Sequence, residues 1–188
     1  MADSIPAWLG RALPNAGAGH ARLAVCVVGS AETLGAGGFA LTSPAFADRE
    51  PLDPMFTADE EDACAPPLAW TAPPAGTRAL VLVVEDPDAL AADPLVHLLG
   101  WGMAPRAGVL LEGEDPPEGG HNSSGIEGWL APDPSVGDPA HDYVFQLFAL
   151  DVPFELAPGS DREAVIEEME DHVIAVAVLT ATYRREEQ

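Results

Sequence analysis

The stretch Leu80-Val-Leu-Val-Val-Glu-Asp-Pro-Asp-Ala89 decides the fold expected of this chain. Its run of apolar residues, rich in valine, predicts a buried β-strand. The strand is expected to stop at Asp86-Pro87-Asp88, because proline has no backbone N–H to donate and its ring fixes φ. Two carboxylates therefore stand where a sheet ends. Taken alone, Asp-Pro-Asp fits an ordinary turn equally well, since both residue types are common in turns for conformational reasons.

A second stretch, Gly137 to Asp151, follows the same plan. A polar turn leads into His141-Asp-Tyr143 and then into an apolar run that only Gln146 interrupts. Apolar residues at nearly every position are typical of a central strand that is covered on both faces. Side chains alternate along a strand, so His141 and Tyr143 face one way and Asp142 faces the other. If the two turns are neighbours, a carboxylate, an imidazole and a phenol converge.

The composition fits one β-rich domain and narrows the range of partners. A chain of 188 residues with 47% hydrophobic content can fill a substantial core, and 19 prolines with 18 glycines favour many turns between short elements. The chain has 31 acidic residues and only 8 basic ones, all arginine, which gives a net charge of −23. Such a charge argues against nucleic acid as a partner and against docking on anionic membranes. Adaptation to high salt and a GC-rich genome both fit this acidity.

The cysteines and the N-terminal residues indicate the cellular compartment in which the protein is expected. Cys26 and Cys64 have neither metal-ligand spacing nor the density of a disulfide framework, so we expect free thiols in a reducing compartment. No run approaches the roughly 20 apolar residues of a membrane helix, and Met1-Ala-Asp-Ser lacks the positive charge of a secretory signal. The sequence therefore predicts a cytoplasmic protein without a membrane span.

Hydrophobic patterning predicts the remaining elements of a mainly β domain at residues 21–188, preceded by an N-terminal extension at residues 1–20. Trp8 and Leu9 favour an extension that packs on the domain. The only helix is expected at 161–171, with Ser160 as N-cap and Glu163 at the capping-box position. Strands are expected at 22–28, 39–42, 68–70, 78–85, 96–101, 143–150 and 173–183, with surface loops at 48–65 and 104–121.

Four ordered blocks carry a resemblance to the phosphatidylethanolamine-binding proteins, in their bacterial and archaeal Raf-kinase-inhibitor-like branch. The resemblance covers roughly residues 39 to 183. Its blocks are Leu41-Thr-Ser-Pro-Ala-Phe46, Pro66-Pro-Leu-Ala-Trp70, Asp86-Pro-Asp-Ala89 with His97 downstream, and Asn122-Ser-Ser-Gly125 followed by His141-Asp-Tyr143. Each block is weak alone, but their order and spacing are specific. The resemblance implies an antiparallel β-sandwich with one or two short helices.

The resemblance also implies an anion-accepting pocket lined by Asp86, His97, His141 and Tyr143. Asp88 is expected to support the pocket loop, and the turn containing Gly137 could add backbone N–H donors. The implied ligand is a small anion such as phosphate or a phospho-head group. Without the resemblance, His97 fits a core residue with satisfied hydrogen bonds better than a ligand-binding residue, and Tyr143 also fits the core with its hydroxyl hydrogen-bonded.

Metal and cofactor sites are not expected. The run Asp59-Glu-Glu-Asp62 fits a solvated acidic loop, because neither a histidine nor a fixed backbone shape completes a coordination shell there. The segment Asn122 to Gly125 is expected to shape its loop, since Asn, Ser and Gly all serve tight turns.

Two positions depart from the family pattern. Asp142 stands where the family usually has arginine, and strand alternation turns it away from the pocket face. Leu90 stands where proline is common. If that peptide bond is cis in the family, keeping it cis before leucine would cost about 3 kcal/mol, so the loop is expected to differ locally.

Three functions remain open from the sequence. A small-ligand binding protein, acting through a protein partner or alone, is favoured over an inhibitor of a protease or kinase. A hydrolase using His141 with Asp86 is least favoured, because the chain has no Gly-x-Ser-x-Gly elbow and nothing places Ser123 or Ser124 beside an imidazole. We therefore expect no enzymatic activity. A homodimer stays open.

Overall fold

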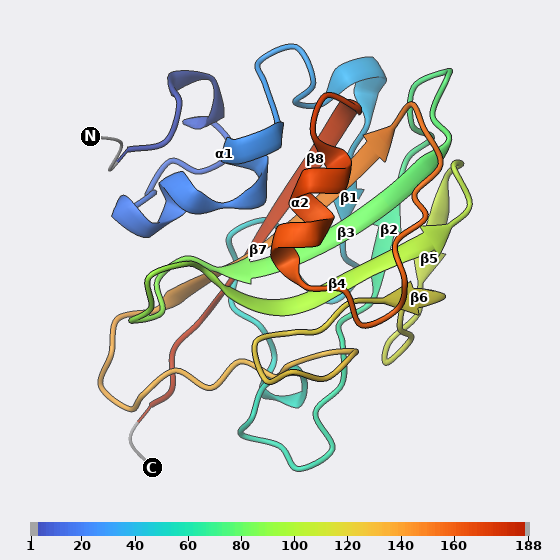
Figure 1. The fold of residues 1–188 in the computed structure, drawn as a ribbon. Helices are drawn as coiled ribbons and strands as arrows, with labels where there is room; N and C mark the ends of the chain where they lie inside the picture. The colour runs from blue at the N-terminus through green and yellow to red at the C-terminus, as the bar shows by residue number, and fades with distance from the viewer. Residues whose placement is uncertain (1–3, 187–188) are drawn as a thin grey trace.

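The computed structural model describes residues 4–186 and has two antiparallel sheets packed face to face (Figure 1). The larger sheet has the order β6-β4-β3-β7-β8, and the smaller has the order β1-β2-β5. The strands are β1 (Leu41–Thr42), β2 (Leu68–Trp70), β3 (Ala79–Asp86), β4 (Leu95–Met103), β5 (Gly108–Leu110), β6 (Glu118–Gly119), β7 (His141–Leu150) and β8 (Val173–Tyr183). The mainly β, antiparallel fold is as the sequence predicts.

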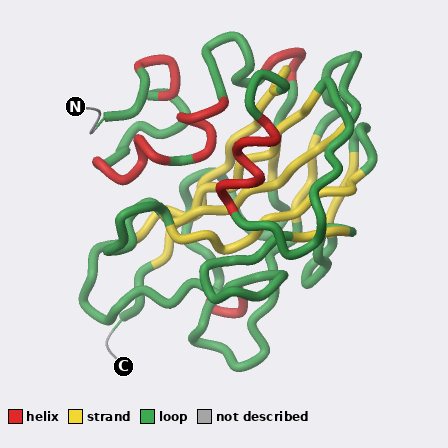
Figure 2. Tube along the Cα trace, viewed as in Figure 1, coloured by secondary structure: helices red, strands yellow, loops and turns green. Residues whose placement is uncertain are grey.

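Helical segments are short and gather mostly on one side of the larger sheet (Figure 2). The two α-helices are α1 (Ala24–Val28) and α2 (Arg162–Met169). The 3-10 turns are η1 (Ala7–Leu9), η2 (Ala18–Arg22), η3 (Ala36–Gly38) and η4 (Pro54–Phe56). None of the helices in the described part of the chain combines the length and apolar character needed to cross a membrane.

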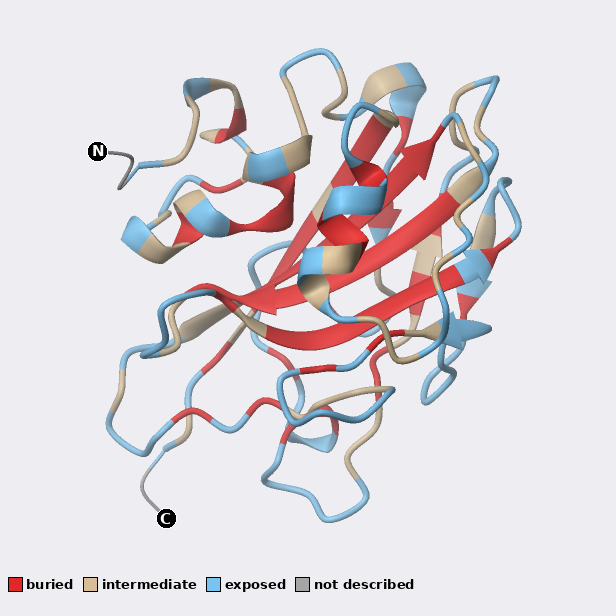
Figure 3. Ribbon diagram, in the orientation of Figure 1, coloured by how far each residue is buried: buried red, intermediate tan, exposed pale blue. Residues whose placement is uncertain are grey.

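Strand β3 is the middle strand of the larger sheet and is buried along almost all of its length (Figure 3). Its side chains contribute to two separate hydrophobic cores. Because side chains alternate along a strand, Leu80 and Leu82 face the small sheet while Val81 and Val83 face the helices. Both faces are covered, which is why the sequence of β3 shows a continuous apolar run.

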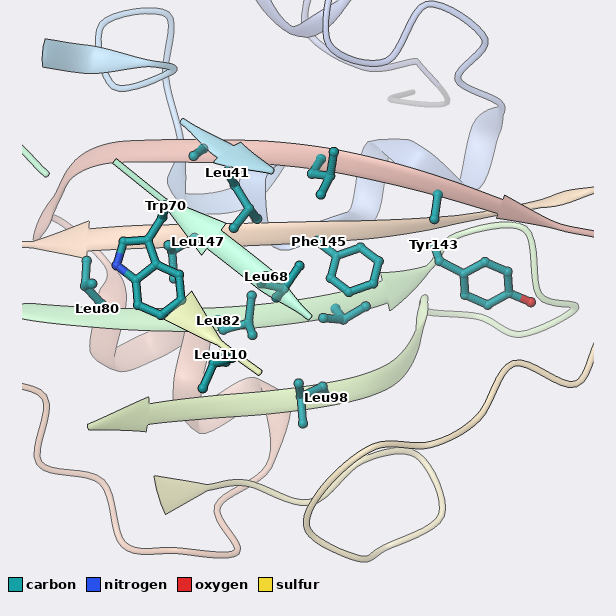
Figure 4. Packing of buried hydrophobic residues seen from close by; sticks show 14 of the residues in the cluster. Leu41, Leu68, Trp70, Leu80, Leu82, Leu98, Leu110, Tyr143, Phe145 and Leu147 are labelled. Atoms are coloured by element: carbon teal, nitrogen blue, oxygen red, sulfur yellow. The ribbon is translucent and has the colours of Figure 1, made fainter. Parts of the chain in front are cut away.

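The first core fills the space between the two sheets (Figure 4). Phe145 and Leu147 of β7 meet Leu41, Leu68 and Trp70 of the small sheet there. The second core lies under α2 and the N-terminal segment, where Leu9 and Leu13 are buried. The N-terminal segment therefore packs on the sheet, as Trp8 and Leu9 suggested.

A buried polar network fastens both helices to the sheet. The Glu85 side chain is fully buried, and its Oε2 accepts the Ala24 N–H at 2.9 Å and a Gln146 amide N–H at 2.8 Å. Its other oxygen pairs with the guanidinium of Arg162 from α2. Gln146 Oε1 accepts the Val25 N–H at 2.8 Å. The first backbone N–H groups of α1 are thus satisfied by side chains of β3 and β7.

Three sequence predictions of local structure are wrong. Residues 22–28, expected as a strand, form the end of η2 and then α1, because Glu85 and Gln146 supply acceptors for the first turn of that helix. The N-cap of α2 is Asp161, whose carboxylate accepts the Ala164 N–H at 3.0 Å, whereas the Ser160 hydroxyl donates to Ala157. The loop expected at 104–121 contains β5 and β6.

Other expectations hold. Strands β2, β3, β4, β7 and β8 lie within a few residues of their predicted bounds. Cys26 and Cys64 are free thiols. The local difference expected of the loop after β3 stays a prediction; within residues 4–186 every peptide bond is trans, and the Leu90 side chain is fully exposed in that loop.

Removal of the Arg162 guanidinium should destabilise the fold. In Arg162→Met, the buried Glu85 carboxyl group would lose its cationic partner, and we expect a loss of about 2–3 kcal/mol in the free energy of unfolding. Urea denaturation of the variant measures this loss. The control is Arg184→Met, which removes the exposed partner of Glu186 and should cost at most about 0.5 kcal/mol. The double variant Glu85→Gln with Arg162→Met should recover part of this loss of stability. Equal losses in Arg162→Met and in the control Arg184→Met would contradict the role of this network.

Candidate functional site

The turn after β3 holds the Asp86 carboxylate in place. Asp86 Oδ1 accepts the backbone N–H groups of Asp88 at 2.8 Å and Ala89 at 3.1 Å, which is the local hydrogen bonding that makes aspartate common in turns. The side chain is almost fully buried. Its second oxygen is left free to point toward the neighbouring strand.

His141 meets that second oxygen. Strands β3 and β7 are antiparallel and pair Glu85 with Val144, so Asp86 comes beside the first residues of β7. The His141 Nδ1 lies 2.8 Å from Asp86 Oδ2. Because a carboxylate only accepts, Nδ1 carries the hydrogen and donates it, and Nε2 remains for the pocket. The two similar sequence stretches, residues 80–89 and 137–151, therefore lie side by side in the sheet.

His97 on β4 has one ring nitrogen with a hydrogen-bond partner and one without. Its Nδ1 lies 2.6 Å from the Leu130 carbonyl oxygen, which can only accept, so Nδ1 is the donor. Its Nε2 is buried and has no hydrogen-bond partner among the described residues. Burial lowers the pKa of His97 against the opposing influence of the Leu130 hydrogen bond and of Asp86. In the neutral ring that burial favours, Nε2 carries the lone pair.

Tyr143 lies behind the two imidazoles. Its ring centroid is 5.1 Å from that of His97, edge-on, and 6.5 Å from that of His141, nearly parallel. The side chain is buried in the core between the sheets (Figure 4), and this burial raises the pKa of its phenol. The structure thus brings Tyr143 to the site, where it packs against both histidines and is not among the residues that line the cavity.

Asp86, His97 and His141 line a cavity of about 230 Å³. Its walls are largely apolar, with Leu90, Leu95 and Leu130 among them, and two further carboxylates, Asp133 and Asp138, stand in its lining. The lining, all of it within residues 4–186, contains no arginine. The two imidazoles are therefore the basic side chains of this lining.

In the loop that supplies Leu130, Asp133 and Asp138, sequence reasoning singled out the turn at Gly137 but not Leu130, Asp133 or Asp138 as residues of the site. This loop lies between residues 129 and 140 and has no hydrophobic period that could have marked it. Its position is held by tertiary contacts: the Leu130 N–H donates to the His97 carbonyl at 2.8 Å, and Arg185 pairs with Asp133. Ion pairing between residues so far apart leaves no local signal in the sequence.

Asp88 and Asp142 form a brace behind the pocket. Asp88 Oδ2 accepts the Asp142 N–H at 2.8 Å, and burial raises the pKa of Asp88. Asp142 Oδ2 lies 2.9 Å from His20 Nε2, while His20 Nδ1 accepts the Gly17 N–H at 3.2 Å. Asp88 thus ties the pocket turn to β7, and Asp142 points away from the cavity toward the N-terminal segment.

The remaining predicted residues shape loops. Gly137 has φ +87°, a conformation that favours glycine, and lies in the turn that leads to β7. Asn122 accepts the Ser124 N–H at 2.9 Å and donates to the Gly128 carbonyl at 3.0 Å. The Ser123 hydroxyl accepts the Val96 N–H at 2.8 Å. Ser123 is therefore held in the loop through its hydroxyl and Ser124 through its backbone N–H.

Comparison with known proteins assigns the family. The family model described as phosphatidylethanolamine-binding protein matches residues 42–184. A UPF0098 protein of Methanothermobacter thermautotrophicus is 36% identical over 152 residues, which cover 77% of this chain and 98% of that protein. The UPF0098 protein Rv1910c of Mycobacterium tuberculosis is 40% identical over 159 residues, covering 77% of this chain and 76% of the relative.

Solved structures agree with this assignment. The crystal structure of CT736 from Chlamydia trachomatis, described as a homologue of phosphatidylethanolamine-binding protein, superposes with a TM-score of 0.72 at 32% identity and covers 78% of this chain and 97% of its own. Escherichia coli YbcL has the same TM-score at 24% identity over 78% and 98% of the two chains, which supports the fold alone. The chain therefore belongs to the phosphatidylethanolamine-binding protein family.

Proposed function

We propose that this protein binds a small anionic ligand, such as phosphate or a phospho-head group, in the cavity between Asp86, His97 and His141. Membership of the family supports a ligand-binding protein in general. The observation that carries the finer proposal is the Asp86–His141 pair, because it orients an imidazole whose Nε2 is left for the cavity. Any action through a protein partner, and a cytoplasmic location, belong to this proposal as well.

The local charges explain how an anion would bind to so acidic a protein. At physiological ionic strength the Debye length is about 8 Å, so most of the surface carboxylates are screened from the cavity. Asp133 and Asp138 remain close and oppose an anion when ionised. A protonated His141 beside Asp86 would supply a charge-assisted donor, whereas burial lowers the pKa of His97 and disfavours its cationic form.

A hydrolase is the second candidate, and one observation favours it. Asp86 and His141 have the geometry of a carboxylate that orients a general base, and Ser135 lines the same cavity. However, no hydrogen bond joins the Ser135 hydroxyl to His141. An activated nucleophile needs that contact, so binding without chemistry is the better-supported function.

Phosphate should bind weakly at pH 8 and more tightly as the pH falls toward 6, because protonation of an imidazole adds a cation to the cavity. His141→Ala should flatten this dependence. Isothermal titration with inorganic phosphate at several pH values is the measurement, with His172→Ala as control, since His172 forms a similar pair with Asp151 on the exposed surface. Equal affinity at pH 6 and pH 8, or an unchanged profile in His141→Ala, would remove His141 from the mechanism.

A panel of ester, phosphate and peptide substrates should show no turnover that depends on the pocket. The prediction compares the wild type with His141→Ala and Ser135→Ala, because any background hydrolysis from a contaminant persists in both variants. The measurement is product release under saturating substrate. One robust activity that both substitutions abolish would establish the hydrolase instead.

A further inference from the structure

The N-terminal segment contacts the loop that forms one side of the cavity mouth. This mouth loop, residues 87–94, joins β3 to β4, and its Ala89 and Leu90 line the cavity. Beyond Ala89, one hydrogen bond among the described residues ties the loop to the rest of the protein, from the guanidinium of Arg22 to the Ala92 carbonyl. A loop with so few hydrogen bonds opens locally at low cost. The N-terminal segment therefore supplies the anchor for the far side of the mouth loop.

The same segment packs against the near side of the loop at Gly19. A Cβ atom on Gly19 would lie 1.9 Å from the Pro87 carbonyl oxygen and 3.0 Å from the carbonyl carbon. Both atoms belong to the backbone, so neither can turn aside as a flexible side chain would, and the proline ring fixes φ of its residue. Gly19 is not among the glycines with a positive φ. Glycine is therefore required here by the lack of space and not by the backbone conformation.

The Pro87 carbonyl belongs to the peptide unit that orients Asp86. Because a peptide unit is planar, the Pro87 oxygen and the Asp88 N–H move together. That N–H donates to Asp86 Oδ1 at 2.8 Å. The other oxygen, Asp86 Oδ2, accepts from His141 Nδ1 at 2.8 Å. A displacement of the Pro87 oxygen therefore turns the N–H away from the carboxylate that orients His141.

We propose that Gly19 and Arg22 are positioning residues of this pocket, although both lie outside the cavity and before residue 42, where the family match begins. Gly19 leaves the space in which the peptide unit after Pro87 presents its N–H to Asp86. Arg22 holds the other end of the mouth loop. The inference goes beyond the proposed function, because it concerns what shapes the pocket and does not depend on which ligand the cavity takes.

Gly19→Ala is the first test, with proton NMR of the His141 ring in the ligand-free protein as the measurement. The Nδ1 hydrogen donates to Asp86 and gives a low-field resonance, which is assigned by its absence from His141→Ala. The methyl group added in Gly19→Ala displaces the peptide unit, so this resonance should be lost. Gly17→Ala is the matched control. It makes the same change two residues earlier, where a Cβ atom meets only His20 Nδ1, at 4.0 Å, and it should keep the resonance.

Arg22→Met is the second variant, and it introduces no overlap. The Arg22 carbonyl, which accepts from the Arg162 guanidinium at 2.6 Å, is unchanged, so the urea midpoint should be that of the wild type. Backbone ¹⁵N relaxation should show order parameters below about 0.6 at residues 90–94, the range of flexible backbone. The wild type and the conservative variant Arg22→Lys, which keeps a cationic donor, should stay above this value.

Ligand binding separates this inference from the proposed function. Isothermal titration with inorganic phosphate at pH 6 should show at least about tenfold weaker binding to Gly19→Ala than to the wild type, as expected when an orienting hydrogen bond is lost. Gly17→Ala should bind as the wild type does. A wild type that binds no phosphate would count against the proposed function alone, because the NMR measurements need no ligand.

Two results would overturn the positioning role. The first is an unchanged His141 resonance in folded Gly19→Ala, or its loss in Gly17→Ala as well. The second is a mouth loop in Arg22→Met that stays as ordered as in the wild type. If Gly19→Ala does not fold, the Arg22→Met measurement decides alone, and loss of order at residues 90–94 supports the proposal.

Discussion

The antiparallel pairing of β3 with β7 is the constraint on which the rest of the structure depends. It pairs Glu85 with Val144 and so brings the end of β3 beside the start of β7. Asp86 then meets His141 on the pocket side. One register step along, Glu85 meets Gln146 on the helix side. A slip of one residue would exchange the two faces, placing Glu85 against the pocket and Asp86 against the helices.

Much of this pairing could be predicted from the sequence because its signals are local. The continuous apolar runs of β3 and β7 indicate strands covered on both faces, and proline after Asp86 marks where β3 ends. Because side chains alternate along a strand, the sequence alone predicted that His141 and Asp142 lie on opposite faces of the sheet. The contact between Asp86 and His141 followed once the two turns were placed together, and the resemblance supplied that placement.

What the sequence could not predict depends on partners that are distant along the chain. The valine-rich run at 22–28 has strand propensity, yet α1 forms there because its N–H groups find Glu85 and Gln146, 61 and 121 residues away. Tyr143 faces the pocket side as alternation requires, but whether it lines the cavity depends on the bulk of the imidazoles in front of it. Asp133 and Asp138 lie in a loop whose path is set by tertiary hydrogen bonds and ion pairs.

The N-terminal segment shows how far support of the pocket extends beyond the residues that resemble the family. The family match begins at residue 42, but Gly19 packs against the turn that carries Asp86: a Cβ atom there would lie 1.9 Å from the Pro87 carbonyl oxygen. Beside it, His20 forms a hydrogen bond with Asp142. An imidazole from outside the family match thus partners the carboxylate at that position. Because Asp142 in turn donates its N–H to Asp88, the brace runs from the N-terminal segment to the turn that orients Asp86.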